Sequence, residues 1–429
     1  MLVPVIFGGY INGYGIIRAL AEHGIKSVLV DRKGTKPVAA VSKYVYKVCY
    51  FHDPESEMEE FLREMIDFGK WLFPEKGILF PTHDEYVITL WKNKKKLSDY
   101  FEFPMSDWET VNQMINKKNL YEICGSLGIP YPKTREITMY PEYMEIRGEL
   151  LFPIIVKPSL WDTELITVLG EKTLIFYDEQ HADKFIKKIY RKLRRPAKLV
   201  VQEYIQGDII HMPDITVFCD KQGKIKSWTA AVKLRQFPPQ TGTSTMARVL
   251  SPDLKMCRIT YEMTKKLVET MGFYGVCDAE YMYDVRDGKY KIIEVNTRFH
   301  MQNYMLCSAG VDMAYYIYCE HQNIAYQYNE VPKRLVSWCK PVEDRYNAVY
   351  YNSKKYKDFG MTRKQWRKSV PKTAIGIIDN DKDIRVFIRY VSGIYRRIIS
   401  DQIRAVCRIP KRVSVMQFFI KKLRGHKAV

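Results

Sequence analysis

The sequence predicts an α/β protein in which a parallel-sheet domain precedes a mixed α+β domain. Three observations support this class. Short apolar strands alternate with amphipathic helices through about residue 105, as in a parallel sheet. Two stretches further on, at 215–231 and 272–303, read as β-hairpins. The chain has 429 residues, of which 46% are hydrophobic and 27% charged, which indicates a globular protein of two or three domains.

The chain begins with a β-α-β unit. Residues 3–7 form an apolar strand, 8–15 a glycine-rich loop, 16–23 a helix and 27–30 a second strand. Arg18 occupies the place of the last glycine of a G-x-G-x-x-G pattern, so the loop is a weak dinucleotide fingerprint. A helix N-terminus behind glycines still offers an anion site.

The alternation continues with a strand at 45–50, a helix at 55–70, a strand at 77–81 and a helix at 84–93. His83 and Asp84 follow a strand, where open α/β sheets place ligands. The simpler prediction is that Asp84 caps the following helix.

The first hairpin pairs 215–219 with 224–231 around a turn at 220–223. It runs on into Lys233 and Arg235, which share a face if the strand continues. Two cations on one face suit a phosphoryl group that is being transferred. The alternative is a basic strand that faces water.

The second hairpin is the most informative part of the chain. Strands at 276–285 and 290–295 flank a turn at 286–288, which places Glu280 opposite Glu294 to within a residue. Asn296 shares the face of Glu294, because side chains alternate along a strand.

Two opposed carboxylates repel each other unless a cation lies between them or one is protonated. Two carboxylates and an amide are hard oxygen ligands that suit Mg²⁺, which then needs phosphate or water oxygens to complete its shell. The hairpin therefore predicts a magnesium nucleotide site. The alternative, acidic residues that face water, fits less well with the apolar runs around Glu280 and Glu294.

Glu280, followed by Glu294-Val-Asn296-Thr-Arg298, resembles the E…E-x-N-x-R signature of the ATP-grasp ligases. The resemblance implies an ATP-grasp fold with metal ligands Glu280, Glu294 and Asn296. It divides the chain into an N-terminal, acceptor-binding domain (1–115), an ATP-grasp domain (116–330, with lobes of about 116–200 and 201–330) and a basic C-terminal region (331–429). Such enzymes phosphorylate a carboxylate with ATP, and an amine then attacks the acyl phosphate.

The resemblance also assigns two lysines to the phosphates of ATP. Lys118 opens the helix that leads to Gly128, with its neighbour Lys117 as the alternative. Lys157 ends a buried strand, where an unpaired charge is costly and a phosphate would be its partner. The following segment, 160–167, lacks the glycines of the phosphate-covering loop found in many relatives.

The stretch 198–208 resembles the linker between the two small lobes of the family. It implies that Glu203 meets the adenine edge, that Tyr204 and Ile205 line the ring, and that Asp208 binds the ribose. The alternative for Gly207-Asp208 is a simple turn.

The detailed resemblance is to carboxylate–amine ligases, and within them to the bacterial D-aspartate ligases of cell-wall assembly. Arg298, Lys233 and Arg235 would then be catalytic, with Arg298 at the tetrahedral species. The implied substrate contacts are Asn12, Tyr14, Arg18 and Asn303, against a purely structural turn around the first three. The implied reaction joins D-aspartate to the lysine amine of a peptidoglycan precursor with ATP and Mg²⁺; the alternatives are another amino acid or a surface-polysaccharide intermediate.

The formal charge of +19 favours polyanionic partners. Much of the excess lies at 385–427, where twelve basic residues face only Asp401: Arg385, Arg389, Arg396, Arg397, Arg404, Arg408, Lys411, Arg412, Lys421, Lys422, Arg424 and Lys427. Interleaved apolar residues make this segment amphipathic. It fits either an anionic membrane surface or a packed helix with a solvated basic face.

Other classes fit the sequence less well. A nucleic-acid-binding protein would be expected to carry a recognition motif, such as the aromatic RNP pattern, and the chain has none. A non-catalytic scaffold would have no need of Lys157, Glu280, Glu294 and Asn296.

The nine cysteines form no C-x-x-C pair, which predicts a reduced protein without a zinc site or disulfide framework. No apolar run approaches the roughly 20 residues needed to span a bilayer. The N-terminus lacks a basic n-region and reads as a strand, not a signal peptide. We therefore expect a cytoplasmic protein, with peripheral contact at the inner face of the cell membrane as a further expectation.

Overall fold

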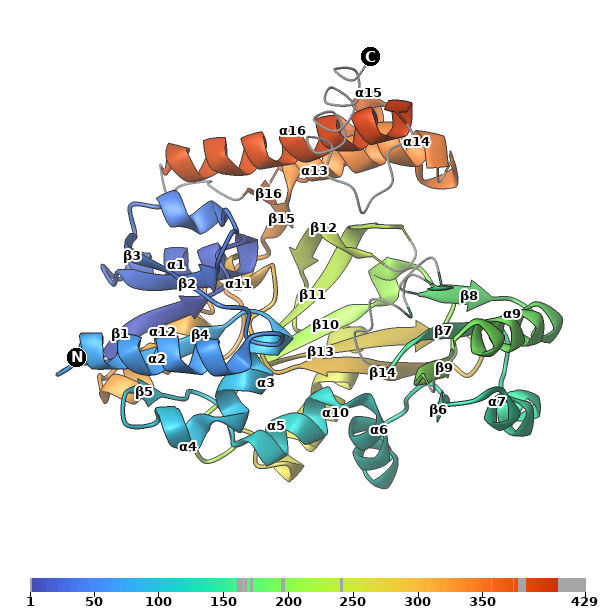
Figure 1. The fold of residues 1–429 in the computed structure, drawn as a ribbon, viewed down its shortest axis with the longest axis horizontal. Coiled ribbons are helices and arrows are strands. Elements are labelled where there is room, and N and C mark those ends of the chain that lie inside the picture. The colour runs from blue at the N-terminus through green and yellow to red at the C-terminus, as the bar shows by residue number, and fades with distance from the viewer. Residues whose placement is uncertain are drawn as a thin grey trace, which may run out of the picture.

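A computed structural model describes residues 2–159, 165, 168–169, 173–193, 197–239, 242–355, 357–372, 374–376 and 383–407. The chain forms three sheets in succession and ends in a helical layer (Figure 1). The predicted α/β class is confirmed.

The first sheet is parallel throughout and has the order β3-β2-β1-β4-β5. Its strands are β1 (Leu2–Phe7), β2 (Ser27–Arg32), β3 (Val45–Phe51), β4 (Lys76–Pro81) and β5 (Phe101–Glu102). The helices that accompany it are α1 (Ile11–Glu22), α2 (Met58–Leu72), α3 (Asp84–Lys92), α4 (Lys94–Leu97) and α5 (Trp108–Ile115).

The predicted glycine-rich loop is shorter than expected, because α1 begins at Ile11 and not at residue 16. Gly13 and Gly15 are therefore helical. A Cβ on Gly13 would lie 1.9 Å from the carbonyl oxygen of Gly8, and one on Gly15 would lie 2.2 Å from Oδ1 of Asn303. These glycines allow close packing and do not supply loop flexibility.

The second sheet is a small antiparallel one with the order β6-β9-β7-β8. It consists of β6 (Thr134–Ile137), β7 (Ile154–Pro158), β8 (Leu174–Phe176) and β9 (Leu199–Glu203), with α6 (Lys117–Ser126) before it and α7 (Tyr140–Ile146) and α9 (Glu179–Lys192) beside it. This lobe has an apolar cluster of its own. The segment 160–167, apart from residue 165, lies outside the described residues.

The third and largest sheet has the order β14-β13-β10-β11-β12-β15-β16. Its strands are β10 (Pro213–Cys219), β11 (Ile225–Phe237), β12 (Thr243–Val249), β13 (Gly275–Asp284), β14 (Lys289–Asn296), β15 (Ser337–Cys339) and β16 (Ala374–Ile375). Both predicted hairpins are confirmed, as β10–β11 and β13–β14. The helices α10 (Lys255–Thr270), α11 (Asn303–Ser308) and α12 (Met313–Gln322) complete this part.

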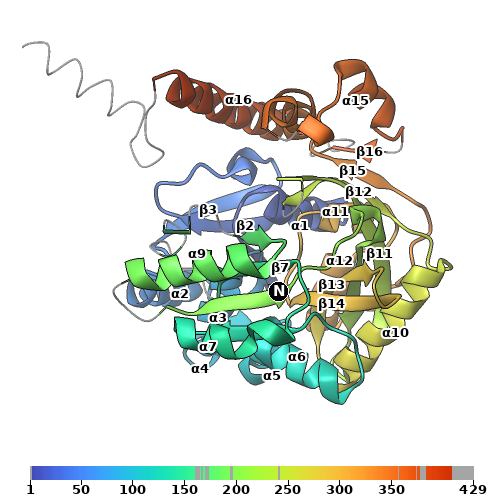
Figure 2. The ribbon, with the colours of Figure 1, turned by 90° about the vertical axis from the view of Figure 1, so that its right-hand side faces the viewer.

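The remaining helices form a layer above the first and third sheets, as two perpendicular views show (Figures 1 and 2). They are α13 (Pro341–Arg345), α14 (Asn352–Lys355), α15 (Arg363–Ser369) and α16 (Ile384–Cys407). β15 and β16, which precede and follow part of this layer, belong to the third sheet, so the predicted division at 331 separates strands of one sheet. The domain boundaries remain a prediction.

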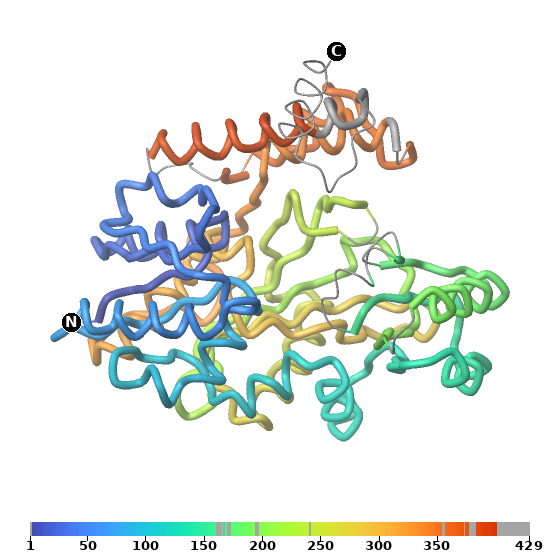
Figure 3. Tube along the Cα trace, in the orientation of Figure 1, coloured from blue at the N-terminus to red at the C-terminus, as the bar shows by residue number. Residues whose placement is uncertain are grey.

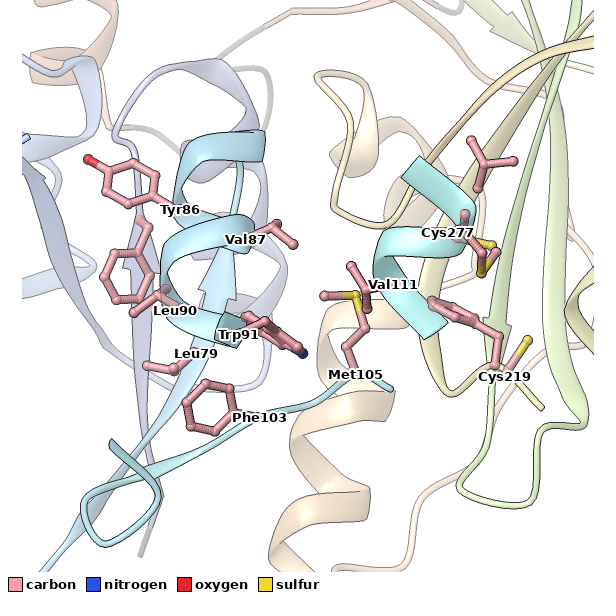
Figure 4. Close-up of a cluster of buried hydrophobic side chains, with 14 of the residues drawn as sticks. Leu79, Tyr86, Val87, Leu90, Trp91, Phe103, Met105, Val111, Cys219 and Cys277 are labelled. Carbon is pink, nitrogen blue, oxygen red and sulfur yellow. The ribbon is translucent and has the colours of Figure 1, made fainter. Parts of the chain in front are cut away.

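The path of the chain shows the small lobe set apart from the rest of the molecule (Figure 3). The first and third sheets, in contrast, share a core. Leu90 and Trp91 of α3 face a cluster that continues through Met105 and Val111 to Cys219 and Cys277 of the third sheet (Figure 4). Sheets one and three therefore form a common platform.

None of the eight cysteines whose side chains are described forms a disulfide bond in this structure. Among the described helices, none combines the length and the apolarity that crossing a bilayer would require.

Candidate active site

A row of three carboxylates runs across neighbouring strands of the third sheet. Glu280 on β13 pairs directly with Glu294 on β14, as the sequence predicted. On its other side Glu280 pairs with Asp214 on β10. Residues that are paired across strands point to the same face, so the three carboxyl groups share one face of the sheet.

Two lysines neutralise this row. Nζ of Lys233 lies 2.8 Å from Oε2 of Glu280, and Nζ of Lys117 lies 2.9 Å from Oε2 of Glu294. Burial opposes the charge on both lysines, yet the nearby glutamates hold the pKa values of Lys233 and Lys117 above the usual range. The repulsion expected between paired glutamates is therefore relieved by one ammonium group for each.

The three carboxyls differ electrostatically. Lys117, with Lys157 and Lys233 contributing further, holds the pKa of Glu294 well below its usual range. Burial raises the pKa of Glu280, and burial together with the charge of Glu280 raises that of Asp214. Oδ1 of Asp214 is buried and has no hydrogen-bond partner among the described residues.

A second row of polar residues crosses the same three strands, two positions along each strand from the row of carboxylates. Thr216, Asp278 and Asn296 are paired across β10, β13 and β14. Oγ1 of Thr216 donates to Oδ1 of Asp278 at 2.9 Å and lies 3.1 Å from Nε2 of His300. The polar face of the sheet is thus two residues deep.

Arg298 follows β14 and borders this face. Its Nη2 donates to Oδ1 of Asn296 at 3.3 Å, and its Nε donates to Asp84 at the start of α3. The prediction that Asp84 caps α3 is wrong: His83 occupies the N-cap position, and Asp84 is the first helical residue and pairs with Arg298. The arginine thereby joins the first sheet to the polar face.

The predicted metal ligands fit a hard cation by chemistry. Glu280, Glu294 and Asn296 supply carboxylate and amide oxygens from adjacent strands, the donor set that Mg²⁺ prefers. No group of three or more His, Cys, Asp or Glu side chains in the described part of the chain is arranged as a metal site. The assignment of Glu280, Glu294 and Asn296 as metal ligands remains a prediction.

The structure brings Lys117, and not Lys118, to the carboxylates. Both open α6, but Lys118 is exposed. The pKa of Glu136 is lowered mainly by hydrogen bonds from Ser159 and Lys198, and the charge of Lys118 adds to this effect. Adjacent residues in the first turn of a helix point about 100° apart, so only one of them can face the sheet. The sequence alone left this choice open by one position.

Lys157 ends β7 in the small lobe, as predicted. Its Nζ lies 3.3 Å from Oε1 of Gln202. Its charge, together with those of Lys117 and Lys233, acts on Glu294. Of the three lysines, Lys117 contacts Glu294 directly, whereas Lys157 of β7 and Lys233 of β11 act on it through their charge.

The predicted adenine and ribose residues lie where the chain leaves the small lobe. Glu203 is buried, and its carboxylate accepts from the backbone N–H groups of Lys133 (3.3 Å) and Leu151 (3.4 Å). The N–H of Tyr204 donates to the carbonyl of Pro153, and Ile205 is buried.

Asp208 accepts from the N–H of Ile210 and begins a short 3-10 helix (Ile209–His211). The turn that the sequence offered as the alternative is therefore present, and the nucleotide roles of this stretch remain predictions.

The predicted substrate residues come together between α1 and α11. Nδ2 of Asn303 donates to the carbonyl of Asn12 at 2.8 Å, and Nδ2 of Asn12 donates to the carbonyl of Thr82 at 2.9 Å. The guanidinium of Arg18 lies 3.7 Å from the ring centre of Tyr304 and 5.8 Å from that of Tyr14. All four predicted residues are buried, and Oδ1 of Asn12 has no partner in the described part of the molecule.

Lys233 and Arg235 do not act on the same group. A β-bulge between them shifts the pairing of β11 with β12 by one residue. Lys233 meets Glu280, whereas Arg235 forms an ion pair with Asp344 on α13. The predicted phosphate clamp of two cations on one face is therefore not present in this arrangement. The sequence could not show the bulge that separates them.

Sequence reasoning missed Asp214, Asp278 and His300. A carboxylate at the start of an apolar strand, as in Pro213-Asp214-Ile215, was an available signal. Its pairing with Glu280 joins residues 66 positions apart, which only the assembled sheet reveals.

Comparison with known proteins agrees with this geometry. A family profile described as "Carbamoyl-phosphate synthase L chain, ATP binding domain" matches residues 246–318. The D-aspartate ligase of Enterococcus faecium (strain Aus0004) is 25% identical over 325 residues, which cover 73% of this chain and 75% of the relative. A carbamoyl phosphate synthase large chain from Thermus thermophilus is 20% identical over 192 residues, or 44% of this chain and only 18% of its own length.

Solved structures resemble most of the chain. An L-amino acid ligase from Bacillus licheniformis superposes with a TM-score of 0.59 and 14% identity, covering 79% of each chain. An N5-carboxyaminoimidazole ribonucleotide synthetase, solved as its ADP complex, gives a TM-score of 0.62 and 13% identity over 92% of this chain and 98% of that one.

The chain has the ATP-grasp fold. The predicted resemblance to ATP-grasp carboxylate–amine ligases is confirmed, and so is the expectation of a ligase that forms carbon–nitrogen bonds. The charge of Lys157 in the small lobe acts on Glu294 of the third sheet, so the predicted nucleotide and metal residues come from two separate sheets.

Proposed function

We propose that the chain is an ATP- and magnesium-dependent, ADP-forming ligase that joins the carboxylate of an amino acid to an amine through an acyl phosphate. The observation that carries this proposal is the contact of Lys117 with Glu294 and of Lys233 with the paired Glu280, with the charge of Lys157 also acting on Glu294. Three cations around two carboxylates suit the phosphates of a metal-bound nucleotide.

Glu280, Glu294 and Asn296 would hold Mg²⁺, which supplies charge neutralisation between the phosphates when it is bound. Because Lys233 and Lys117 already contact these glutamates, their Nζ atoms lie next to the oxygens that such a complex would present. The lysines then stabilise the negative charge that spreads over the phosphoryl group during transfer.

Arg298 would act at the next step. It borders Asn296 and is held by Asp84, so its guanidinium is fixed at the edge of the polar face. A fixed cation there would stabilise the oxyanion formed when the amine adds to the acyl phosphate. The reaction then needs no side-chain nucleophile and depends on positioning and charge.

For the substrates we propose D-aspartate as the carboxylate and the lysine amine of a peptidoglycan precursor as the acceptor. The support is the similarity to the E. faecium D-aspartate ligase over most of both chains. Another amino acid, or a surface-polysaccharide intermediate, is the alternative. Asn12 and Asn303 would contribute to the substrate side, since the buried Oδ1 of Asn12 has a free acceptor position.

The test is magnesium-dependent ADP release in the presence of hydroxylamine, over a panel of D- and L-amino acids. Hydroxamate formed with one amino acid would establish the acyl phosphate and identify the carboxylate. Glu294→Gln should abolish turnover with an unchanged fold, whereas Glu262→Gln, an exposed change on α10, should not affect it. Undiminished turnover in Glu294→Gln would contradict the metal assignment, and absence of ATP binding would contradict the whole proposal.

A further inference from the structure

The helix α16 lies in the outer helical layer and packs through only one side (Figures 1 and 2). Val386, Tyr390, Ile394 and Ile398, spaced four residues apart, are at most 8% exposed. They pack towards the segment Val38–Val41 and α13. Arg397 donates to Glu343 of α13 at 2.6 Å, which fixes the rotation of the helix.

A second apolar stripe on α16 faces away from this contact. Ile384, Ile388, Tyr395 and Ile399 are each between 45% and 60% exposed. With about 100° of rotation per residue, these four side chains fall within a sector of about 60°. Folded proteins usually expose large apolar side chains singly, so a continuous stripe indicates a contact surface.

Basic side chains border this stripe along one edge. Arg385, Arg389 and Arg396 follow it at about 40–80° of further rotation. Arg385 and Arg396 are exposed. The helix α15 of the same outer layer exposes four more cations, Arg363, Lys364, Arg367 and Lys368. The partner of this surface must therefore be apolar along a line and anionic beside it.

We propose that the outward face of α16 docks on an anionic phospholipid bilayer, with the helix axis parallel to the membrane. The apolar stripe enters the boundary between headgroups and acyl chains, and the arginines bind lipid phosphates. Nucleic acid would satisfy the arginines but not the isoleucines. A second copy of the chain would satisfy the isoleucines but would bring two rows of arginines together.

The part of the basic segment beyond residue 400 adds to the charge in the sequence, but its side chains lie outside the described residues. The proposal rests on residues 384–399 and is independent of the proposed ligase activity.

The experiment is co-sedimentation of the full chain with vesicles of phosphatidylglycerol and phosphatidylcholine, against vesicles of phosphatidylcholine alone. We expect binding to the anionic vesicles only, weakened by salt because the arginine contacts are screened. The triple change Ile384→Ser, Ile388→Ser, Ile399→Ser should lower the partition coefficient at least tenfold. A matched control, Ile210→Ser, Leu254→Ser, Ile324→Ser, removes three residues that are 43–47% exposed elsewhere and should bind like the unaltered chain.

The arginines give a second arm. Arg385→Gln and Arg396→Gln should each weaken binding about fivefold. Three outcomes would each overturn the proposal: the isoleucine variant binds as well as the unaltered chain, the unaltered chain binds neutral vesicles as well as anionic ones, or the unaltered chain does not bind vesicles at all. So would a dimer of the unaltered chain that the isoleucine variant abolishes, because a second copy would then cover the stripe. Hydroxamate formation without vesicles tests the ligase activity separately.

Discussion

Arg235 donates to the carboxylate of Asp344 through both Nε and Nη2, at 2.9 Å and 2.7 Å. Asp344 is almost fully buried and also accepts from Thr245 and from the indole of Trp366. Its neighbour Glu343 binds Lys340 and Arg397. Two adjacent acidic residues of α13 thus tie the outer layer to the third sheet and to α16.

Asp344→Asn should be strongly destabilising. It removes the charge that compensates a largely buried guanidinium, a change that costs about 3–5 kcal/mol of unfolding free energy. Chemical denaturation would measure the loss. Asp253→Asn, which breaks the exposed pair with Arg258, is the control and should cost less than about 1 kcal/mol. Similar losses in both variants would show that the buried pair has no special role.

Lys117→Met and Lys118→Met should differ sharply, although the residues are neighbours. The first removes a cation that contacts Glu294, and we expect kcat/KM for ATP to fall about 10²- to 10³-fold. The second removes an exposed cation and should change the same ratio by no more than about twofold. Coupled ADP-release kinetics would measure both ratios. A larger loss in Lys118→Met than in Lys117→Met would show that Lys118 is the phosphate-binding lysine, as the sequence first suggested.

Asp214→Asn should lower kcat more than it changes KM for ATP. Asp214 lies beside Glu280 and helps to keep Lys233 charged, so it positions the lysine and does not bind the nucleotide directly. We expect a fall in kcat of about tenfold or more. A loss confined to thermal stability, with kcat unchanged at low temperature, would make Asp214 merely structural.

Gly15→Ala should disturb the predicted substrate side. Its Cβ would lie 2.2 Å from Oδ1 of Asn303, so that side chain must move and lose its bond to Asn12. We expect a loss of about 1–3 kcal/mol in stability and a raised KM for the amino acid, with KM for ATP unchanged. Gly148→Ala, where nothing lies within 4 Å, is the control. Equal KM values in both variants would remove Asn303 from the substrate side.

His321 should make the fold sensitive to mild acid. Burial, with Lys221 adding to it, lowers the pKa of His321 to about 4, and its Nε2 lies 2.6 Å from the hydroxyl of Tyr274. The unfolded chain takes up the proton first, at an ordinary pKa of about 6.5. Stability is therefore lost as the pH falls from about 6.5 to about 4, by up to about 3 kcal/mol.

His321→Asn should flatten this dependence, measured by denaturation at several pH values. His181→Asn on α9, where the ring is exposed, should leave it as it is. An unchanged slope in His321→Asn would rule out the buried imidazole as its source.

Local chemistry predicted much of this molecule. The pairing of Glu280 with Glu294 followed from a turn and two strands that are close in sequence, so the register was fixed by a few residues. The early start of α1 was missed because Gly13 and Gly15 read as loop residues, whereas they allow Gly8 and Asn303 to approach.

Long-range geometry was less accessible. The pairing of Arg235 with Asp344 spans more than a hundred residues and depends on a bulge, and neither leaves a periodic signal. The choice between Lys117 and Lys118 depended on helix rotation, which the sequence fixes only to within a residue.

The separate apolar core of the small lobe has a mechanical consequence. The chain enters the lobe around 127–133 and leaves it around 204–212, while the first and third sheets share their cores and carry the outer layer. We expect any closure over a substrate to be a rotation of the small lobe against the platform. Such a rotation would move Lys157 and leave Lys117, Lys233 and both glutamates in place, so one side of the site alone would adjust to a phosphate.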